Sequence, residues 1–244
     1  MPSGLKWATC NVGATKPEEY GLYFAWGETQ GYSGITNEKQ FSWSDYKLCG
    51  GSNSTLTKYN NNSSNGTVDN LTTLEQVDDA AYQSDNTCRM PTKADLEELI
   101  ANTTSTWETL NGVNGRRFTS KTNSNSIFVP AAGFCINGSV DDVGYFGGLW
   151  RSSLSGRNPS YGWYLSFDSD GVYMNSYYRY GGLSVRAVQE ANISSKFDPK
   201  ETVSKLSDLE SKTVEIENQL SNVYTKEEVD DLIPTDYITE EQLT

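Results

Sequence analysis

The stretch of sequence that decides the fold reads Trp163-Tyr164-Leu165-Ser166-Phe167-Asp168-Ser169-Asp170-Gly171-Val172-Tyr173-Met174-Asn175. Residues 162–167 and 172–175 are rich in aromatic and apolar side chains, and the Asp-Ser-Asp-Gly between them is a turn signal, so the stretch predicts a β-hairpin. Because side chains alternate along a strand, residues 163, 165 and 167 share one face, and residues 164 and 166 share the other. The residues expected in the hydrophobic core are Trp150, Leu165, Phe167, Val185 and Val188.

Further strands and one helix are expected outward from this hairpin. Runs with strand character lie at residues 117–120, 126–130 and 183–188. A helix is expected over residues 93–100, because Thr92 can cap it with Asp95 as its partner. Its apolar face would consist of Leu96, Leu99 and Ile100. The chain also has 21 Gly, 15 Tyr, 8 Phe and 6 Trp, and residues 53–70 form a polar Asn-, Ser- and Thr-rich loop. The fold class predicted from this pattern is α+β, with β-structure dominant.

The composition of the chain changes near residue 190. The first region contains every Trp and all but two Tyr, whereas Gly is absent beyond it. Such a shift indicates a domain boundary. The predicted organisation is a binding domain over residues 1–190, a linker over 191–199, a coiled coil over 200–223 and the start of fibrous shaft repeats over 224–244.

A heptad pattern follows the linker. Its apolar positions are spaced by 3, 4, 3, 4 and 3 residues, as in the a/d seam of a coiled coil, and they are Leu206, Leu209, Thr213, Ile216, Leu220 and Val223. The alternative is an amphipathic helix packed on the first domain. We expect the seam to form a parallel trimer, although these residues also fit a dimer. Thr225 and Glu228 form a capping-box pattern that recurs at Thr239 after 14 residues, which suggests small repeated shaft units.

The charge of the chain argues against two classes of partner. The net charge is −13, and the acidic residues are concentrated towards the C-terminal end. A nucleic-acid-binding protein needs a basic face to neutralise phosphates, and no such face is visible, so no nucleic acid is expected as a partner. Anionic membrane surfaces are disfavoured for the same reason. No apolar run is long enough to insert across a bilayer. Both ends of the chain look like cuts within a longer protein.

Catalytic and metal-binding residues are not predicted. The chain has no His, so Ser-His-Asp and Cys-His arrangements are impossible. Zinc sites are disfavoured because Cys10, Cys49, Cys88 and Cys135 include no CxxC pair. The four cysteines allow two disulfides in three pairings, or four buried thiols. The acidic stretches at residues 141–142 and 168–171 are better explained as turns than as calcium ligands. We therefore expect no enzyme, no metal and no cofactor.

The positive signal is a cluster of aromatic and polar residues in and after the hairpin. Tyr combines a large contact area with a hydroxyl group and few rotatable bonds, which is why binding surfaces favour it. Strand alternation sends about half of such a cluster into the core. We expect the ligand-binding residues on one exposed surface, with residues 175–182 irregular. They are Tyr161, Trp163, Tyr173, Asn175, Ser176, Tyr177, Tyr178 and Tyr180.

Several motifs together resemble a known family. They include Leu5-Lys6-Trp7-Ala8-Thr9-Cys10-Asn11-Val12-Gly13-Ala14, Arg89-Met90-Pro91-Thr92, Phe128-Val129-Pro130-Ala131-Ala132-Gly133, Leu149-Trp150-Arg151-Ser152-Ser153 and Gly182-Leu183-Ser184-Val185-Arg186-Ala187-Val188. In this order, over residues 3–189, they resemble the Fibrobacter succinogenes major paralogous domain of Bacteroidetes and their phages. The resemblance implies a C-type-lectin-like fold related to the formylglycine-generating enzymes.

The chain departs from the active relatives of that fold. The catalytic cysteine pair of the formylglycine-generating enzymes has no match, because Cys135 is the only cysteine after Cys88. The Glu-Pro-Asn motif of sugar-binding animal lectins is also absent. Residues 144–188 resemble the variable region of diversity-generating retroelement proteins, and residues 224–230 resemble segments of phage tail and head fibres.

These resemblances lead to one expectation of function and two alternatives. The chain is expected to be a non-enzymatic receptor-binding module of a phage fibre or tail tip on the virion surface. It would recognise a Bacteroidetes cell-surface glycan or protein and form a homotrimer alongside other virion proteins. One alternative is an adhesive or scaffold protein on the bacterial surface or secreted from it. The other is a structural head- or tail-fibre decoration whose aromatic face binds another virion protein.

Overall fold

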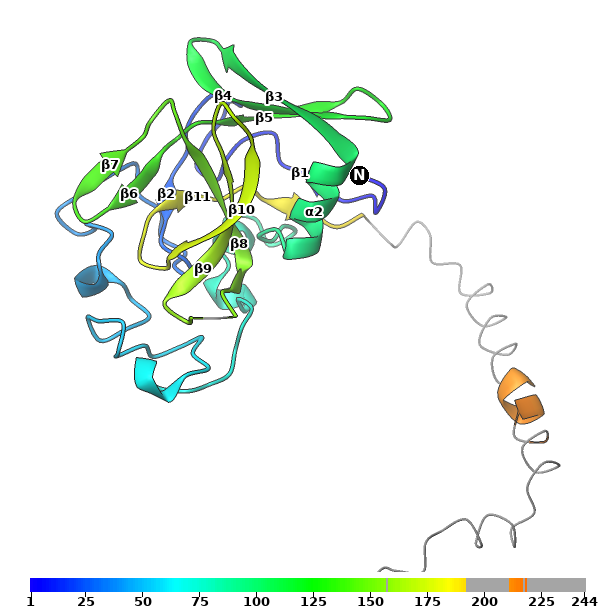
Figure 1. Cartoon of the computed structure of the whole chain (residues 1–244), viewed down its shortest axis with the longest axis horizontal. Coiled ribbons are helices and arrows are strands. Elements are labelled where there is room, and N and C mark those ends of the chain that lie inside the picture. The colour runs from blue at the N-terminus through cyan, green and yellow to red at the C-terminus, as the bar shows by residue number, and fades with distance from the viewer. Residues whose placement is uncertain (157, 192–210, 217, 219–244) are drawn as a thin grey trace, which may run out of the picture. The chain divides into compact units, whose positions relative to one another are not determined.

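A computed structural model describes residues 1–156, 158–191, 211–216 and 218 of the chain. Its contacts divide the chain into two compact units, Met1–Ala191 and Asn192–Thr244. In the described part of the first unit, strands predominate and helices are few (Figure 1). The fold is therefore a β-rich mixed fold, and the predicted fold class is confirmed at this level.

The first unit is built around a five-stranded sheet with the order β10-β9-β8-β11-β2. The strands are β10 (Val172–Tyr178), β9 (Tyr161–Phe167), β8 (Gly147–Leu154), β11 (Leu183–Ser184) and β2 (Tyr23–Phe24). All neighbours are antiparallel except β11 and β8. The predicted hairpin is confirmed as β9–β10, with Phe167 opposite Val172. Its turn closes because the Asp168 carboxylate accepts hydrogen bonds from the backbone N–H groups of Asp170 and Gly171, at 2.8 and 3.0 Å.

A second sheet and the longest helix of the first unit cover one face of the first sheet. The second sheet has the order β3 (Thr103–Leu110), β4 (Val113–Ser120) and β5 (Ser126–Pro130). Helix α2 (Lys93–Asn102) begins at the predicted capping box, in which the Thr92 and Asp95 side chains each accept a hydrogen bond from the other residue's backbone N–H. Leu96 and Leu99 are buried as expected, but Ile100 is 37% exposed, so the buried stripe is narrower than predicted.

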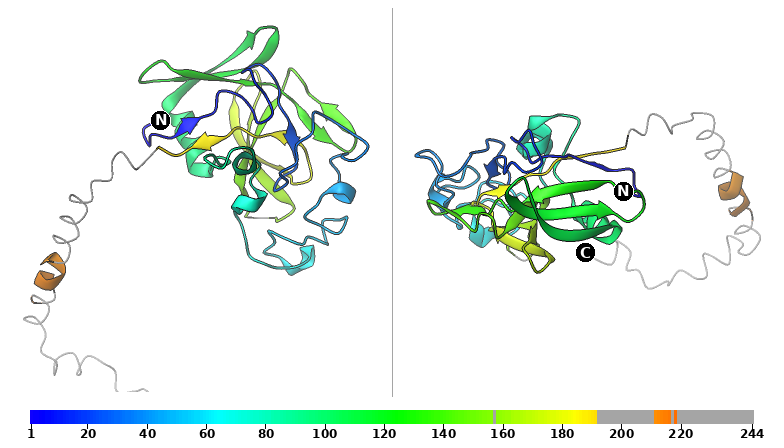
Figure 2. Two further views of the ribbon diagram at one scale, coloured as in Figure 1. Left: turned by 180° about the vertical axis from the view of Figure 1, so that it is seen from behind. Right: turned by 90° about the horizontal axis from the view of Figure 1, so that it is seen from above.

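The remaining elements are short. They are β1 (Lys6–Trp7), β6 (Phe134–Ile136), β7 (Ser139–Asp141), β12 (Val188–Gln189), α1 (Ala80–Ser84) and three 3₁₀ helices, η1 (Trp43–Asp45), η2 (Ser63–Asn65) and η3 (Gln76–Asp78). Strand β1 pairs with β12, so the two ends of the unit lie side by side (Figure 2). The run at residues 183–188 is not one strand, because β11 ends at Ser184 and β12 starts at Val188.

The core lies on both faces of the five-stranded sheet. On one face, Leu149, Leu165 and Phe167 pack with residues of α2, β4 and β5. On the other face, Trp150 and Tyr164 pack with Trp26, Leu183 and Val185. All five residues expected in the core are buried, each at 0% exposure. Gly162 allows this packing, because a Cβ atom there would lie 2.8 Å from Cδ1 of Trp26.

The cysteines are free thiols, so neither disulfide forms. Cys135 is fully buried, and the other three are partly buried. Burial raises the pKa of the Cys135 thiol to about 12. A buried thiol of this kind acts as a small apolar side chain.

In the second unit, residues 211–216 are helical, and Val214 and Ile216 are exposed within it. Thr213 and Ile216 of the predicted seam fall in this segment. Leu206, Leu209, Leu220 and Val223 lie outside the described residues, as do residues 224–244. No helix in the described part of the chain is long and apolar enough to cross a membrane.

Candidate ligand-binding site

The register of the β9–β10 hairpin assigns the predicted binding residues to two faces of the sheet. Tyr178 lies opposite Tyr161, and Ser176 lies opposite Trp163. Directly opposed residues share a face, so these four side chains lie on one face. Tyr173, Asn175 and Tyr177 alternate with them and lie on the other face. The expectation of one common surface is therefore corrected to two. Residues 175–178 are also not irregular, because β10 continues to Tyr178.

The first of these faces is hollowed into an open cavity of about 380 Å³. Its lining residues are Ser155, Asn158, Tyr161, Trp163 and Ser176. Three of them are predicted binding residues. Ser155 and Asn158 were missed, because they belong to the connection between β8 and β9, where no pattern distinguishes a binding residue from a turn residue.

The polar groups of this cavity are positioned by local hydrogen bonds. The backbone N–H of Ser155 donates to the Tyr161 carbonyl at 2.8 Å. The Asn158 side-chain oxygen accepts from the backbone N–H of Ser160 at 2.9 Å, which orients the amide and leaves its NH₂ group as a donor. Ser176 is exposed on β10. Hydroxyl and amide groups therefore stand beside the Trp163 ring.

A row of aromatic rings extends from the cavity. The rings of Tyr161 and Tyr178 lie 4.5 Å apart, those of Tyr178 and Tyr180 stack at 5.2 Å, and Tyr180 contacts Trp43 at 4.8 Å. A hydrogen bond with Tyr178, together with burial, raises the pKa of Tyr161 to about 12. Tyr161 and Tyr178 are partly exposed, but Tyr180 is only 6% exposed. Tyr180 is thus a supporting residue, contrary to the prediction.

Arg179 fixes the strand end and the adjoining loops beneath this row. Its side chain is fully buried and donates to the Tyr46 hydroxyl at 2.6 Å. It also donates to the carbonyls of Tyr59, Lys58 and Pro159, at 3.0, 3.0 and 3.2 Å. Pro159 belongs to the loop that carries Asn158. One guanidinium group therefore holds three separate segments around the cavity.

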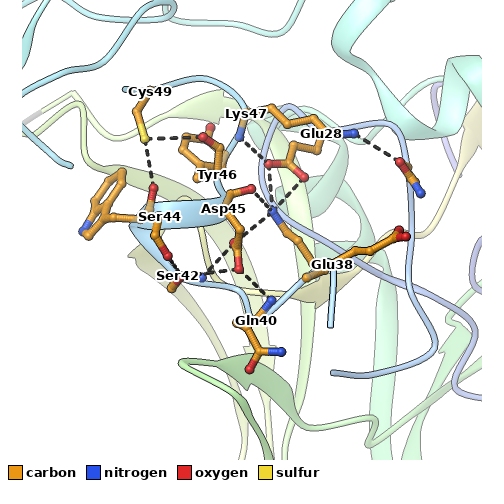
Figure 3. A network of polar contacts seen from close by, with 12 residues as sticks. Glu28, Glu38, Gln40, Ser42, Ser44, Asp45, Tyr46, Lys47 and Cys49 are labelled. Atoms are coloured by element: carbon orange, nitrogen blue, oxygen red, sulfur yellow. Dashed lines mark hydrogen bonds and ion pairs between the residues drawn. The ribbon is translucent and has the colours of Figure 1, made fainter. Parts of the chain in front are cut away.

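A second polar network holds the segment that carries Trp43 (Figure 3). Buried Lys39 forms ion pairs with Glu28 at 2.9 Å and with Asp45 at 3.4 Å. Asp45 closes the 3₁₀ turn η1 by accepting hydrogen bonds from the backbone N–H groups of Gln40 and Ser42. Figure 3 shows these carboxylates converging from two loop segments. Because both charges of the Lys39–Glu28 pair are buried, breaking the pair would be costly, and the segment is firmly anchored.

The opposite face contributes little to the cavity. Tyr173 is 47% exposed, and the Asn175 amide donates to the Ser166 hydroxyl at 2.8 Å. Tyr177 is partly buried and contacts the rings of Phe134 and Tyr164, at 5.5 and 6.1 Å. Burial raises the pKa of Tyr177 above its ordinary value. Tyr177 is therefore mainly a packing residue.

Two other cavities lie away from the predicted residues. One, of about 420 Å³, is formed near β1 by residues that include Trp7, Leu99 and Phe118. The other, of about 320 Å³, includes Asp79. The Asp79 carboxylate already accepts hydrogen bonds from the backbone N–H groups of Ala81, Tyr82 and Met90, so it serves as a structural cap.

The β9–β10 cavity combines aromatic faces with neutral hydrogen-bonding groups. This combination suits reversible binding of a ligand that has both flat apolar faces and hydroxyl groups. Among the described residues, no group of three or more His, Cys, Asp or Glu is placed to hold a metal ion. No family model matches the chain, and neither a curated protein nor a solved structure matches it.

Proposed function

We propose that residues 1–190 form a non-enzymatic binding domain with a C-type-lectin-like fold. The domain would be the receptor-binding module of a phage fibre or tail tip, and it would recognise a molecule on the surface of a Bacteroidetes cell. The ordered motifs over residues 3–189 and the β-rich fold support this assignment. The observation that carries the binding function is the open cavity lined by Tyr161, Trp163 and Ser176.

The construction of the cavity favours binding with little rearrangement. Trp163 and Tyr161 stand on β9, which is paired on both sides, and Arg179 fixes the adjoining loop from below. Rigid aromatic side chains lose little conformational entropy when a ligand arrives. Ser155, Asn158 and Ser176 can then select a ligand by hydrogen bonding.

The C-terminal region supports display on a fibre. A heptad seam followed by repeated capping-box units is expected of a trimeric stalk that continues into a shaft. Three copies of a weak site on one stalk would bind a dense cell surface much more tightly than one copy, because the second and third contacts are intramolecular. Moderate affinity in each cavity would therefore suffice.

A pair of matched variants tests the site. Ser176 and Asn175 are adjacent exposed residues of β10 that lie on opposite faces. Ser176→Glu places a larger, charged side chain in the cavity, whereas Asn175→Glu places the same side chain on the other face. Binding of the labelled 244-residue chain to a panel of Bacteroidetes strains is measured. We expect Ser176→Glu to weaken binding by about tenfold or more and Asn175→Glu to change it little. Equal losses in both variants, or no binding of the wild type to any strain, would contradict the proposal.

A further inference from the structure

Arg151 forms no ion pair with a described residue, and it packs against Trp163, one of the residues that line the cavity. Arg151 is only 7% exposed, and its guanidinium carbon lies 4.9 Å from the centre of the Trp163 ring. It occupies the part of β8 where the register with β9 shifts, between Trp150 and Leu154. Such irregularities re-aim side chains in a strand. Here the irregularity accompanies a cation packed against Trp163, one of the two aromatic residues that line the cavity.

The guanidinium group of Arg151 is not satisfied by the part of the protein that is described. No hydrogen bond or ion pair joins it to another described residue, and its Nε atom is buried without a partner. Glu97 acts on it electrostatically, but that carboxylate forms its ion pair with Lys93, at 3.2 Å. Burial lowers the pKa of Arg151 below its ordinary value.

Three other arginines are also buried, and each of them has hydrogen-bond acceptors. Arg116 is 6% exposed, and although its Nε atom is also unpaired, it donates to the Ser105 hydroxyl and to the carbonyls of Asp168 and Ser169. Arg179 donates four hydrogen bonds. Arg186 donates to the Asn11 side chain and to the carbonyls of Ala8 and Phe128. The buried Nε atom of Arg151 lacks such a partner, which costs free energy that an incoming oxyanion can recover. Arg151 therefore has the properties of a ligand contact rather than of a structural brace.

We propose that the cavity takes an acidic saccharide, with its oxyanion paired to Arg151 and its sugar ring against Trp163. The proposal rests on the proposed function and specifies the ligand class of that site. Tyr161 and Trp163 offer apolar faces to the C–H groups of a sugar ring, and Ser155, Asn158 and Ser176 offer hydrogen bonds to its hydroxyls. Arginine is the side chain best suited to pair with a planar carboxylate.

The net negative charge of the domain opposes the binding of an acidic ligand. Residues 1–191 contain 19 acidic and 14 basic side chains, so the domain as a whole repels anions. Any preference for an acidic ligand must therefore come from a local cation. Polyanion binding through a broad basic surface would not depend on one buried arginine.

Polymers with one shared backbone provide the test. The 244-residue chain is titrated with dextran, carboxymethyl dextran and dextran sulfate at physiological salt. We expect carboxymethyl dextran to bind about tenfold or more tightly than dextran. Titration with dextran sulfate shows whether the site accepts a sulfate in place of a carboxylate. Arg151→Gln should abolish the preference for the charged polymer, and Arg151→Lys should keep part of it. Arg117→Gln is the control, because Arg117 lies on β4 and pairs with Glu108 on β3, and neither residue lines the cavity.

Circular dichroism and thermal melting establish that each variant is folded before its binding is compared. Equal binding of neutral and charged polymers, no binding of any anionic polymer, or an unchanged preference in Arg151→Gln would overturn the proposal. The two proposals fail separately. If wild-type protein binds Bacteroidetes cells and Ser176→Glu does not, but anionic dextrans neither bind nor compete, the binding function stands and the acidic ligand is wrong.

Discussion

The charged guanidinium group of Arg179 is buried, and the acceptors of its hydrogen bonds are neutral carbonyl and hydroxyl groups. Replacing it with Met would leave the carbonyls of Lys58, Tyr59 and Pro159 without this donor and would release the loops that they belong to. We expect Arg179→Met to lower the free energy of unfolding by about 3 kcal/mol or more, since each buried polar group left unpaired costs about 1–3 kcal/mol. Urea unfolding followed by circular dichroism measures this loss.

The matched control for that change is Arg117→Met. Arg117 is 30% exposed and pairs with Glu108 at 2.7 Å. Exposed pairs contribute about 0–1 kcal/mol, so this variant should unfold near the wild-type urea concentration. Equal losses from both substitutions would mean that the buried network around Arg179 contributes no more to the free energy of unfolding than the Arg117–Glu108 pair does.

At the level of single residues, local patterns predicted burial better than they predicted function. Leu165 and Phe167 were assigned to the core correctly, because strand alternation fixes their side. Tyr180 was misassigned, because its burial depends on Trp43, which is distant in sequence. Arg151 gave no signal, since an arginine without a partner is recognisable only when its surroundings are known.

Helix α2 illustrates how far one local motif determines an element. Thr92 accepts a hydrogen bond from the backbone N–H of Asp95 and donates from its hydroxyl to the Asp95 carboxylate. We expect Thr92→Ala to reduce stability by about 1 kcal/mol, because the first helical turn loses its cap. Thr67→Ala serves as the control, because Thr67 is exposed in a loop. Chemical denaturation measures both, and an equally small loss in both would contradict a stabilising role for the cap.

The other elements were predictable where their contacts are local. Strand β5 and the β9–β10 hairpin follow from short patterns of alternation and turn residues. The run at residues 183–188 divides because its backbone bonds to the distant N-terminal segment. Val12 N–H donates to the Val185 carbonyl, and Ala8 N–H donates to the Ala187 carbonyl, both at 2.9 Å. No periodicity within residues 183–188 could reveal those partners.

For the whole molecule, the candidate site could be predicted in composition but not in arrangement. The aromatic and polar residues of the hairpin were identified, and Tyr161, Trp163 and Ser176 do line one cavity. Its other wall comes from the β8–β9 connection, and its support comes from residues near positions 28–59. Those contacts join segments that are far apart in the sequence, so no local sequence pattern reveals them.

We expect the protein to become less stable at alkaline pH, because several tyrosine hydroxyls and the Cys135 thiol have raised pKa values in the folded state. Burial raises the pKa of Tyr59 and of Tyr164 to about 12, the hydrogen bond with Tyr178 does the same for Tyr161, and Cys135 rises from 9.0 to about 12. Between about pH 9 and 12 the unfolded chain loses these protons while the folded protein retains them, so increasing pH favours unfolding. Arg186 acts in the opposite sense, because burial lowers its pKa to about 10.

We therefore expect the urea midpoint to be steady below about pH 9 and to fall as the pH approaches 12. The acidic groups whose pKa is raised outnumber the two arginines whose pKa burial lowers, Arg151 and Arg186. Equilibrium unfolding at a series of pH values measures the midpoint, and tyrosinate absorbance recorded on the same samples follows ionisation. A midpoint that stays constant or rises over this interval would contradict the assignment of these protons to the folded state.

The heptad seam can be tested by two substitutions that differ only in their position on one helical segment. Val214 and Ile216 are both β-branched and are 55% and 61% exposed in a single chain, but only Ile216 belongs to the predicted seam. A seam residue would be buried between chains in a trimer, where an unpaired carboxylate is strongly unfavourable.

We expect light scattering to give the wild type a mass near three times the 27.1 kDa of one chain. Ile216→Asp should dissociate this assembly at micromolar concentration, and Val214→Asp should leave it intact. A monomeric wild type would refute the trimer, and dissociation by both substitutions would place the association outside the predicted seam.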